Sequence, residues 1–232
     1  CAPSLEEHTL ALGEPAYLRH PLPEGRELLG RGIAKQVPQL GQAIRPGEVN
    51  WMVAGRGITH SERFEKARAQ SDFLHGIQAW IALPTQAEEA EPSFSHHAES
   101  GLPMLQQDGV WLRVIAGRGY GLQSPVRTHS PLLYAHVRLA AGSKLPLPGG
   151  YAECGVYLVT GALDFSGQAL VPGQLAVIDP DTEAPVATTD SELMLLAGDP
   201  VGQRFIDWNF VSSSPARLEQ ARADWLAGRF TL

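Results

Sequence analysis

The chain has 232 residues, of which 44% are hydrophobic and 19% are charged, so it holds enough apolar material for a substantial core. Its formal net charge of −7 argues against direct nucleic-acid binding, because that mode needs clustered Lys and Arg to neutralise phosphates. No apolar run approaches the roughly 18 residues of a membrane span and the first residues do not resemble a signal peptide, so we expect a cytoplasmic protein without a membrane partner.

Short strands separated by turn residues are expected along most of the chain. Residues 43–83 form a first β-rich block, residues 110–119 a single alternating strand, and residues 132–196 a third block with several strands. Within the first block, residues 57–62 and 74–83 have the composition of strands. Short strands at such regular spacing predict an all-β sandwich or barrel.

Helix signals are few. Residues 63–70 are expected as either a short helix or a charged loop. At the C-terminus Ser214 is a good N-cap, Pro215 is tolerated at the first helical position, and Gly228 supplies the end. One apolar face of this helix is formed at helical spacing by Leu218, Ala221, Trp225 and Leu226. We expect the helix to pack across the β-barrels without a role in an active site.

An internal repeat predicts a duplicated domain. Pro46-Gly47 and Pro172-Gly173 are 172 − 46 = 126 positions apart, and an apolar stretch follows each pair. Pro-Gly suits the corner of a type II turn, because Pro presets φ and Gly accepts positive φ. We therefore expect two tandem β-barrels, with residues 1–125 as the N-terminal barrel and residues 126–232 as the C-terminal barrel plus its helix.

The segment with the best prospect of chemistry follows the first repeat unit, at residues 55–62. In a strand, His60 and Glu62 point to the same face because side chains alternate. One imidazole and one carboxylate that converge in a barrel suit a first-row transition metal. The glycines ahead of them permit a close backbone approach or a bend at the rim. The alternative is an ordinary hydrogen-bonded pair near the mouth of the barrel.

The other histidines have simpler interpretations. His96 and His97 are adjacent, so on a strand they face opposite sides and cannot chelate one metal together. His75 lies in an apolar stretch and is expected as a packed or cavity-lining residue. No carboxylate pattern accompanies His129 and His136 in the second barrel.

The segment RPGEVNWMVAGRGITHSER, followed by LHGIQAWIALP and EPSFSHH, resembles the pirin family of the cupin superfamily. The similarity resumes in SPLLYAHVRL, in YLVTGALDFSGQALVPGQL and in WNFVSSSPARLEQARADWLAGRF, and so covers most of the chain. The resemblance implies a bicupin fold whose N-terminal barrel, the metal-site domain, holds a non-haem Fe(II) on four protein ligands. Two of those ligands match His60 and Glu62. Another divalent transition metal also fits these donors.

The sequence also departs from the family pattern. Family members carry a His-Pro-His motif on an earlier strand, whereas this sequence contains no His-x-His. Only RGIAKQVP stands where the family has several strands and the other two ligands, so the N-terminal barrel is expected to lack strands near residues 30–36. Either the protein has lost that part or the sequence omits it. His20 is the nearest substitute, but its neighbours match the N-terminal strand of the family better.

Two main functions follow from the resemblance. The first is an oxygenase of the quercetin 2,3-dioxygenase type, with a flavonol-like small molecule as substrate and His60 and Glu62 as its catalytic metal ligands. The second is a non-enzymatic regulatory module, in which the metal is weakly bound or absent and a protein is the partner, as the acidic net charge favours. Eukaryotic pirins act as nuclear co-regulators, which implies a nuclear location for a eukaryotic chain. A third outcome is an incomplete barrel that exposes strand edges and apolar surface. The sequence identifies no substrate-binding residues.

Overall fold

The computed structural model describes residues 42–59, 76–179 and 182–229, all of which belong to the larger of the two units of the chain, Gly32–Leu232. The strands within these residues are β1 Val49–Val53, β2 Ser93–His97, β3 Met104–Gln107, β4 Val110–Gly119, β5 Leu122–Gln123, β6 Leu132–Leu139, β7 Glu153–Thr160, β8 Leu163–Phe165, β9 Gln168–Leu170, β10 Leu175–Ile178, β11 Val186–Ala187, β12 Ser191–Gly198, β13 Phe205–Asp207 and β14 Phe210–Ser212. The helices are the 3-10 turns η1 Thr85–Ala87 and η2 Glu99–Gly101 and the α-helix α2 Pro215–Leu226.

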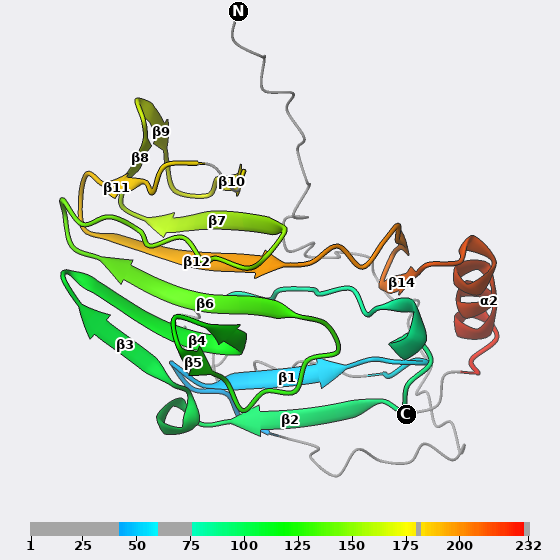
Figure 1. Ribbon diagram of the computed structural model, residues 1–232. Helices are drawn as coiled ribbons and strands as arrows, with labels where there is room; N and C mark the ends of the chain where they lie inside the picture. The colour runs from blue at the N-terminus through cyan, green and yellow to red at the C-terminus, as the bar shows by residue number, and fades with distance from the viewer. Residues whose placement is uncertain (1–41, 60–75, 180–181, 230–232) are drawn as a thin grey trace, which may run out of the picture. The chain divides into compact units, whose positions relative to one another are not determined.

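The largest sheet in the described residues is antiparallel and has seven strands (Figure 1). Its strands follow the order β10-β7-β12-β6-β4-β3, and β5 pairs with β4. On β4 the residues Val110, Leu112, Val114 and Ala116 are buried in strict alternation, which confirms the strand predicted at these positions. One face of this sheet packs with the three-stranded sheet β11-β8-β9 around a core that includes Leu112, Leu158 and Leu163. The two stacked sheets resemble a jelly roll and do not close into a barrel within the described residues.

The opposite face of the large sheet carries a second apolar cluster. Its buried members include Leu132, Tyr134 and Met194, and Val49 and Trp51 of β1 pack against them. β1 pairs with β2, and these two strands form a separate sheet. The cluster therefore holds β1 in place, and the chain leaves β1 for the segment that contains the candidate site.

Both predicted Pro-Gly corners are confirmed. The backbone N–H of Glu48 donates to the carbonyl of Arg45 at 3.0 Å, and that of Gln174 donates to the carbonyl of Val171 at 3.2 Å. Gly47 and Gly173 have φ angles of 81° and 87°, a region that glycine adopts without strain. Each corner leads into a strand, β1 or β10, as the repeat predicted.

The C-terminal helix is confirmed, but half of its predicted apolar face is exposed. The Ser214 side chain accepts a hydrogen bond from the N–H of Arg217, and Pro215 opens α2. Leu218 and Ala221 are buried, and the other two residues of the face, Trp225 and Leu226, are 44% and 78% exposed. Trp225 packs against Trp208 in the β13–β14 turn, with ring centroids 4.9 Å apart, and does not enter the core.

The strand predicted at residues 74–83 is wrong where the structure describes it. Residues 76–84 form no strand, because no described strand pairs with them. Their large apolar side chains are exposed, with Ile77 at 45%, Trp80 at 55% and Ile81 at 37%. Residues 57–59 are also outside any strand, and the remaining positions of the predicted strand at 57–62 lie outside the described residues, as do residues 63–70.

The all-β class with one C-terminal α-helix is confirmed in the described residues. No helix among them is long and apolar enough to cross a membrane. The division between residues 125 and 126 stays a prediction. β4 and β6, which lie on either side of it in the sequence, are neighbours in the large sheet.

Candidate functional site

A glycine turn at residues 54–57 follows β1 directly. The N–H of Gly57 donates to the carbonyl of Ala54, and the N–H of Arg56 donates to the carbonyl of Ala90, each at 3.0 Å. Gly55 has a φ of 52°, and a Cβ added there would lie 2.0 Å from the oxygen of Ala90. The glycine is therefore required by a close backbone approach, as the sequence indicated.

The turn is also held by charged side chains. The guanidinium of Arg56 pairs with both carboxylate oxygens of Glu91, with Nη2 to Oε2 at 2.7 Å. From α2, the Nη2 of Arg217 donates to the carbonyl oxygen of Arg56 at 3.1 Å, and its Nε donates to Oε1 of Glu89 at 2.8 Å. The turn thus contacts both the acidic segment at residues 88–91 and the C-terminal helix.

The same acidic segment is anchored more deeply through Glu88. Its carboxylate lies 2.8 Å from Nε of Arg204, and the two side chains are only 13% and 11% exposed. Glu88 also accepts hydrogen bonds from the hydroxyl of Ser212 and from the N–H and hydroxyl of Ser213, at 2.9 to 3.1 Å. Arg204 donates in turn to the carbonyl of Leu83. The C-terminal residues therefore fix the segment on which the glycine turn rests.

The predicted metal ligands His60 and Glu62 lie outside the described residues, as do His20 and His75. Their placement stays a prediction. Thr59, two residues after Gly57, is the last described residue before His60, so the described contacts are those of the turn that leads to His60.

The histidines of β2 contact different partners. His96 Nδ1 lies 2.8 Å from Oδ1 of Asn50, on the paired strand β1, and this contact makes Nδ1–H the donor. Its Nε2 lies 3.8 Å from Oε2 of Glu48. His97 Nε2 lies 3.0 Å from the hydroxyl of Ser95, and burial, together with the neighbouring His96, lowers the pKa of His97. No group of three or more His, Cys, Asp and Glu side chains in residues 42–59, 76–179 and 182–229 is placed to hold a metal.

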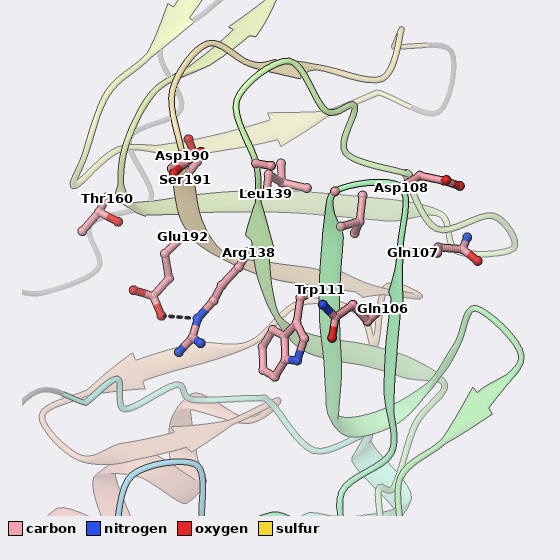
Figure 2. A pocket seen from close by; sticks show the side chains of 13 residues that line it. Gln106, Gln107, Asp108, Trp111, Arg138, Leu139, Thr160, Asp190, Ser191 and Glu192 are labelled. Atoms are coloured by element: carbon pink, nitrogen blue, oxygen red, sulfur yellow. Dashed lines mark hydrogen bonds and ion pairs between the residues drawn. The ribbon is translucent and has the colours of Figure 1, made fainter.

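An open hollow of about 680 Å³ lies at one end of the large sheet (Figure 2). Trp111, Arg138 and Glu192 line it from the neighbouring strands β4, β6 and β12, where Arg138 is the direct cross-strand partner of the other two. The guanidinium carbons of Arg138 and Arg113 each lie 5.0 Å from the ring centroid of Trp111, within the range of a cation–π interaction.

Glu192 joins this cluster to His136, a pairing that the sequence did not reveal. Oε1 of Glu192 lies 2.6 Å from Nε2 of His136, so a carboxylate accompanies His136 in space although no sequence pattern indicates it. The two residues are 56 positions apart and meet only because β6 and β12 are paired. Asp190, also in the hollow, accepts from the N–H of Ala141 at 2.9 Å. Since these carboxylates already have protein donors, we interpret the hollow as a structural polar cluster.

The His136–Glu192 pair predicts a loss of stability in acid. Burial lowers the pKa of His136 from 6.5, although its hydrogen bond with Glu192 opposes the shift. Burial favours the neutral form of Glu192, but the hydrogen bond and charge of His136, together with Arg138, lower the pKa of its carboxyl below 4.5. Both groups bind protons more readily in the unfolded chain, so the free energy of unfolding falls as the pH falls. His136 contributes to this loss below about pH 6.5, and Glu192 contributes below about pH 4.5.

We expect the melting temperature to drop between about pH 7.5 and pH 5.5, and to drop less in His136→Gln. Circular dichroism melts at each pH measure the effect. The exposed His129, changed to Gln, is the matched control and should follow the unmodified chain. If the melting temperature changes equally with pH in all three proteins, the pH dependence belongs to other groups.

With the fold and these contacts established, comparison with known proteins gives the family. Residues 38–81 match the model of the pirin family, and residues 134–231 match that of the pirin C-terminal cupin domain. A pirin-like protein of Caulobacter vibrioides is 50% identical over 191 residues, which are 82% of this chain and 66% of that protein. The chain belongs to the pirin family. The resemblance stated from the sequence is thereby confirmed.

Other pirin relatives carry further names. A putative quercetin 2,3-dioxygenase of Pseudomonas aeruginosa is 35% identical over 191 residues, covering 81% of this chain and 59% of its own length. Human pirin is 30% identical over 192 residues, covering 78% of this chain and 64% of its own length. The chain thus spans 59% to 66% of the length of these curated relatives.

Solved structures support the fold. The crystal structure of a quercetin 2,3-dioxygenase from Acinetobacter baumannii matches with a TM-score of 0.69 at 24% identity, covering 81% of this chain and 68% of that chain. A second structure of that name from the same organism matches with a TM-score of 0.65 at 26% identity, over 81% of this chain and 62% of that chain. Together with the match to the pirin C-terminal cupin domain, these structures confirm the predicted cupin fold class.

Proposed function

We propose that this protein binds a divalent metal through His60 and Glu62 and acts as an oxygenase of the quercetin 2,3-dioxygenase type. The observation that carries the proposal is the glycine turn at residues 54–57, which Ala90, Glu91 and Arg217 hold immediately before His60. This turn and both proposed ligands lie within the residues that match the pirin family model. Two relatives at 35% identity that carry the name of a putative quercetin 2,3-dioxygenase support the reaction type.

The donor set fits such a metal. A neutral imidazole and a carboxylate are ligands that Fe(II) and similar first-row ions accept, and we propose non-haem Fe(II). When bound, the metal would supply the activation of oxygen and of a hydroxylated substrate. The carboxylate of Glu62 offsets part of the metal's charge, and His60 must be deprotonated to coordinate, so binding should weaken in acid. With only two such donors, affinity is expected to be lower than at a fully protein-ligated site.

The substrate and the cellular location belong to the same proposal. A planar flavonol-type molecule is proposed as the substrate on the basis of the relatives' names. We propose a cytoplasmic location, or a nuclear one in a eukaryotic source.

Metal content and turnover test the proposal together. Protein expressed in iron-rich medium is expected to hold iron at about one equivalent per chain and to consume quercetin, as followed by elemental analysis and absorbance. His60→Ala and Glu62→Gln are each expected to lower metal affinity about tenfold or more, because each removes one of two donors. His129→Ala, at an exposed position, is the control and should retain the metal. A chain that stays metal-free after iron-rich expression would refute the proposal.

A second candidate function is a non-enzymatic module that binds another protein. The exposed apolar side chains Ile77, Trp80 and Ile81 favour it, since side chains of this kind often mark interaction surfaces. Metal-loaded protein that leaves quercetin unchanged and retains one specific protein in a pull-down would support this candidate. The loss of that protein on Trp80→Ser would locate the contact.

A further inference from the structure

The C-terminal helix reaches the turn that precedes the proposed metal ligands. We propose that Arg217 of α2 is a positioning residue for the metal-binding segment and acts through the glycine turn at residues 54–57. This inference rests on the proposed function, since it assigns a role at the same metal site. Arg217 itself is not a ligand in this scheme.

The guanidinium of Arg217 joins two separate segments. Its Nε donates to the carboxylate of Glu89 at 2.8 Å, and its Nη2 donates to the carbonyl oxygen of Arg56 at 3.1 Å. The planar fork of an arginine allows both bonds at once, whereas a lysine offers a single ammonium group. Arg217 therefore fixes the backbone of the turn relative to the acidic segment.

The turn has further supports, all close to Arg56. The N–H of Arg56 bonds to the carbonyl of Ala90, and its side chain pairs with Glu91. Arg217 supplies the support on the carbonyl side of the same residue. His60 follows Arg56 by four residues in the sequence, so the anchored turn closely precedes the proposed ligands in the chain. Loosening the anchor should therefore widen the range of positions open to the ligands.

The helix that carries Arg217 is itself firmly held. Leu218 and Ala221 are buried, and the N-cap Ser214 satisfies the N–H of Arg217. The residues just before the helix, Ser212 and Ser213, bond to Glu88. A side chain on such a support can restrict the turn that it contacts. That restriction matters because metal sites depend on ligands held to within a fraction of an ångström.

The same helix supplies a matched control. Arg222 lies on α2, its Nη1 is 3.8 Å from Oδ2 of Asp207, and its side chain is 68% exposed. Arg222→Ala removes the same charge from the same helix as Arg217→Ala. It leaves every contact of the glycine turn in place.

The test uses the full chain with Fe(II) and Co(II) as probes. We expect Arg217→Ala to weaken Co(II) binding about tenfold, the loss that corresponds to one charge-assisted hydrogen bond, while Arg222→Ala binds as the unmodified chain does. The visible spectrum of bound Co(II), which reports ligand geometry and not stability, should change in Arg217→Ala alone. Amide exchange across residues 54–59 should speed up in the same variant. The Co(II) affinity of Arg217→Lys should lie between that of Arg217→Ala and that of the unmodified chain.

The outcomes separate the two ideas. If the unmodified chain binds neither ion, the proposed function fails and this inference falls with it. If it binds metal and Arg217→Ala matches Arg222→Ala in affinity and spectrum, the positioning role is refuted while the proposed function stands. A merely structural role would lower the melting temperature and leave the Co(II) spectrum unchanged. Should Arg217→Ala fail to fold, the pair Arg217→Lys and Arg222→Lys decides by the same comparison.

Discussion

Gly55→Ala is expected to lower the free energy of unfolding by about 3 kcal/mol, with the turn before His60 as the part most affected. Two costs combine. The φ of 52° is a left-handed conformation that disfavours a side chain, and the new Cβ would lie 2.0 Å from the backbone oxygen of Ala90. A backbone oxygen cannot rotate away as a side chain can, so the turn must move. Urea unfolding measures the loss.

Gly121→Ala separates the two costs. Gly121 has a φ of 74°, but no heavy atom lies within 4 Å of the position that a Cβ would take there. This variant should therefore lose only the conformational part, about 1 kcal/mol. If the two variants lose the same free energy, the close approach at Ala90 contributes nothing and the account of the turn is wrong.

Glu88→Ala is expected to cost about 3 kcal/mol, because it leaves the guanidinium of Arg204 without a counter-charge at a largely buried position. The Glu88 and Arg204 side chains are 13% and 11% exposed, and the hydrogen bonds from Ser212 and Ser213 are lost as well. Thermal and urea unfolding measure the effect. Faster amide exchange at residues 83–91 should accompany it, since Arg204 also holds the carbonyl of Leu83.

The neighbouring Glu89→Ala is the control for that change. Its carboxylate is 60% exposed and pairs with Arg217 across the surface. Exposed ion pairs contribute about 0 to 1 kcal/mol, so this variant should remain close to the unmodified chain in stability. A loss as large as that of Glu88→Ala would show that burial does not distinguish the two carboxylates.

Local patterns in the sequence predicted several elements well. The Pro46-Gly47 and Pro172-Gly173 corners, the alternating strand β4 and the Ser214 cap of α2 all appear where expected. Each depends on the φ preference or the side-chain spacing of a few consecutive residues, so distant parts of the chain do not alter it.

Predictions that depended on another segment of the chain for pairing or packing were less accurate. The apolar run at residues 76–83 has the composition of a strand but no described strand pairs with it. Trp225 was expected on the packed apolar face of the helix, but it is 44% exposed and packs against Trp208. Composition favours a strand or a buried helix face, but a strand or a buried face forms only where another segment of the chain pairs with it or packs against it.

The sequence by itself determined the pirin-like motifs, the β-rich class, the two Pro-Gly corners and the choice of His60 and Glu62 as candidate ligands. Only the tertiary structure decided what supports that segment. Ser212 contacts Glu88 across 124 positions, and Arg217 contacts the carbonyl of Arg56 across 161. No local pattern records such pairings, because they depend on where the C-terminal residues return after the sheets have formed.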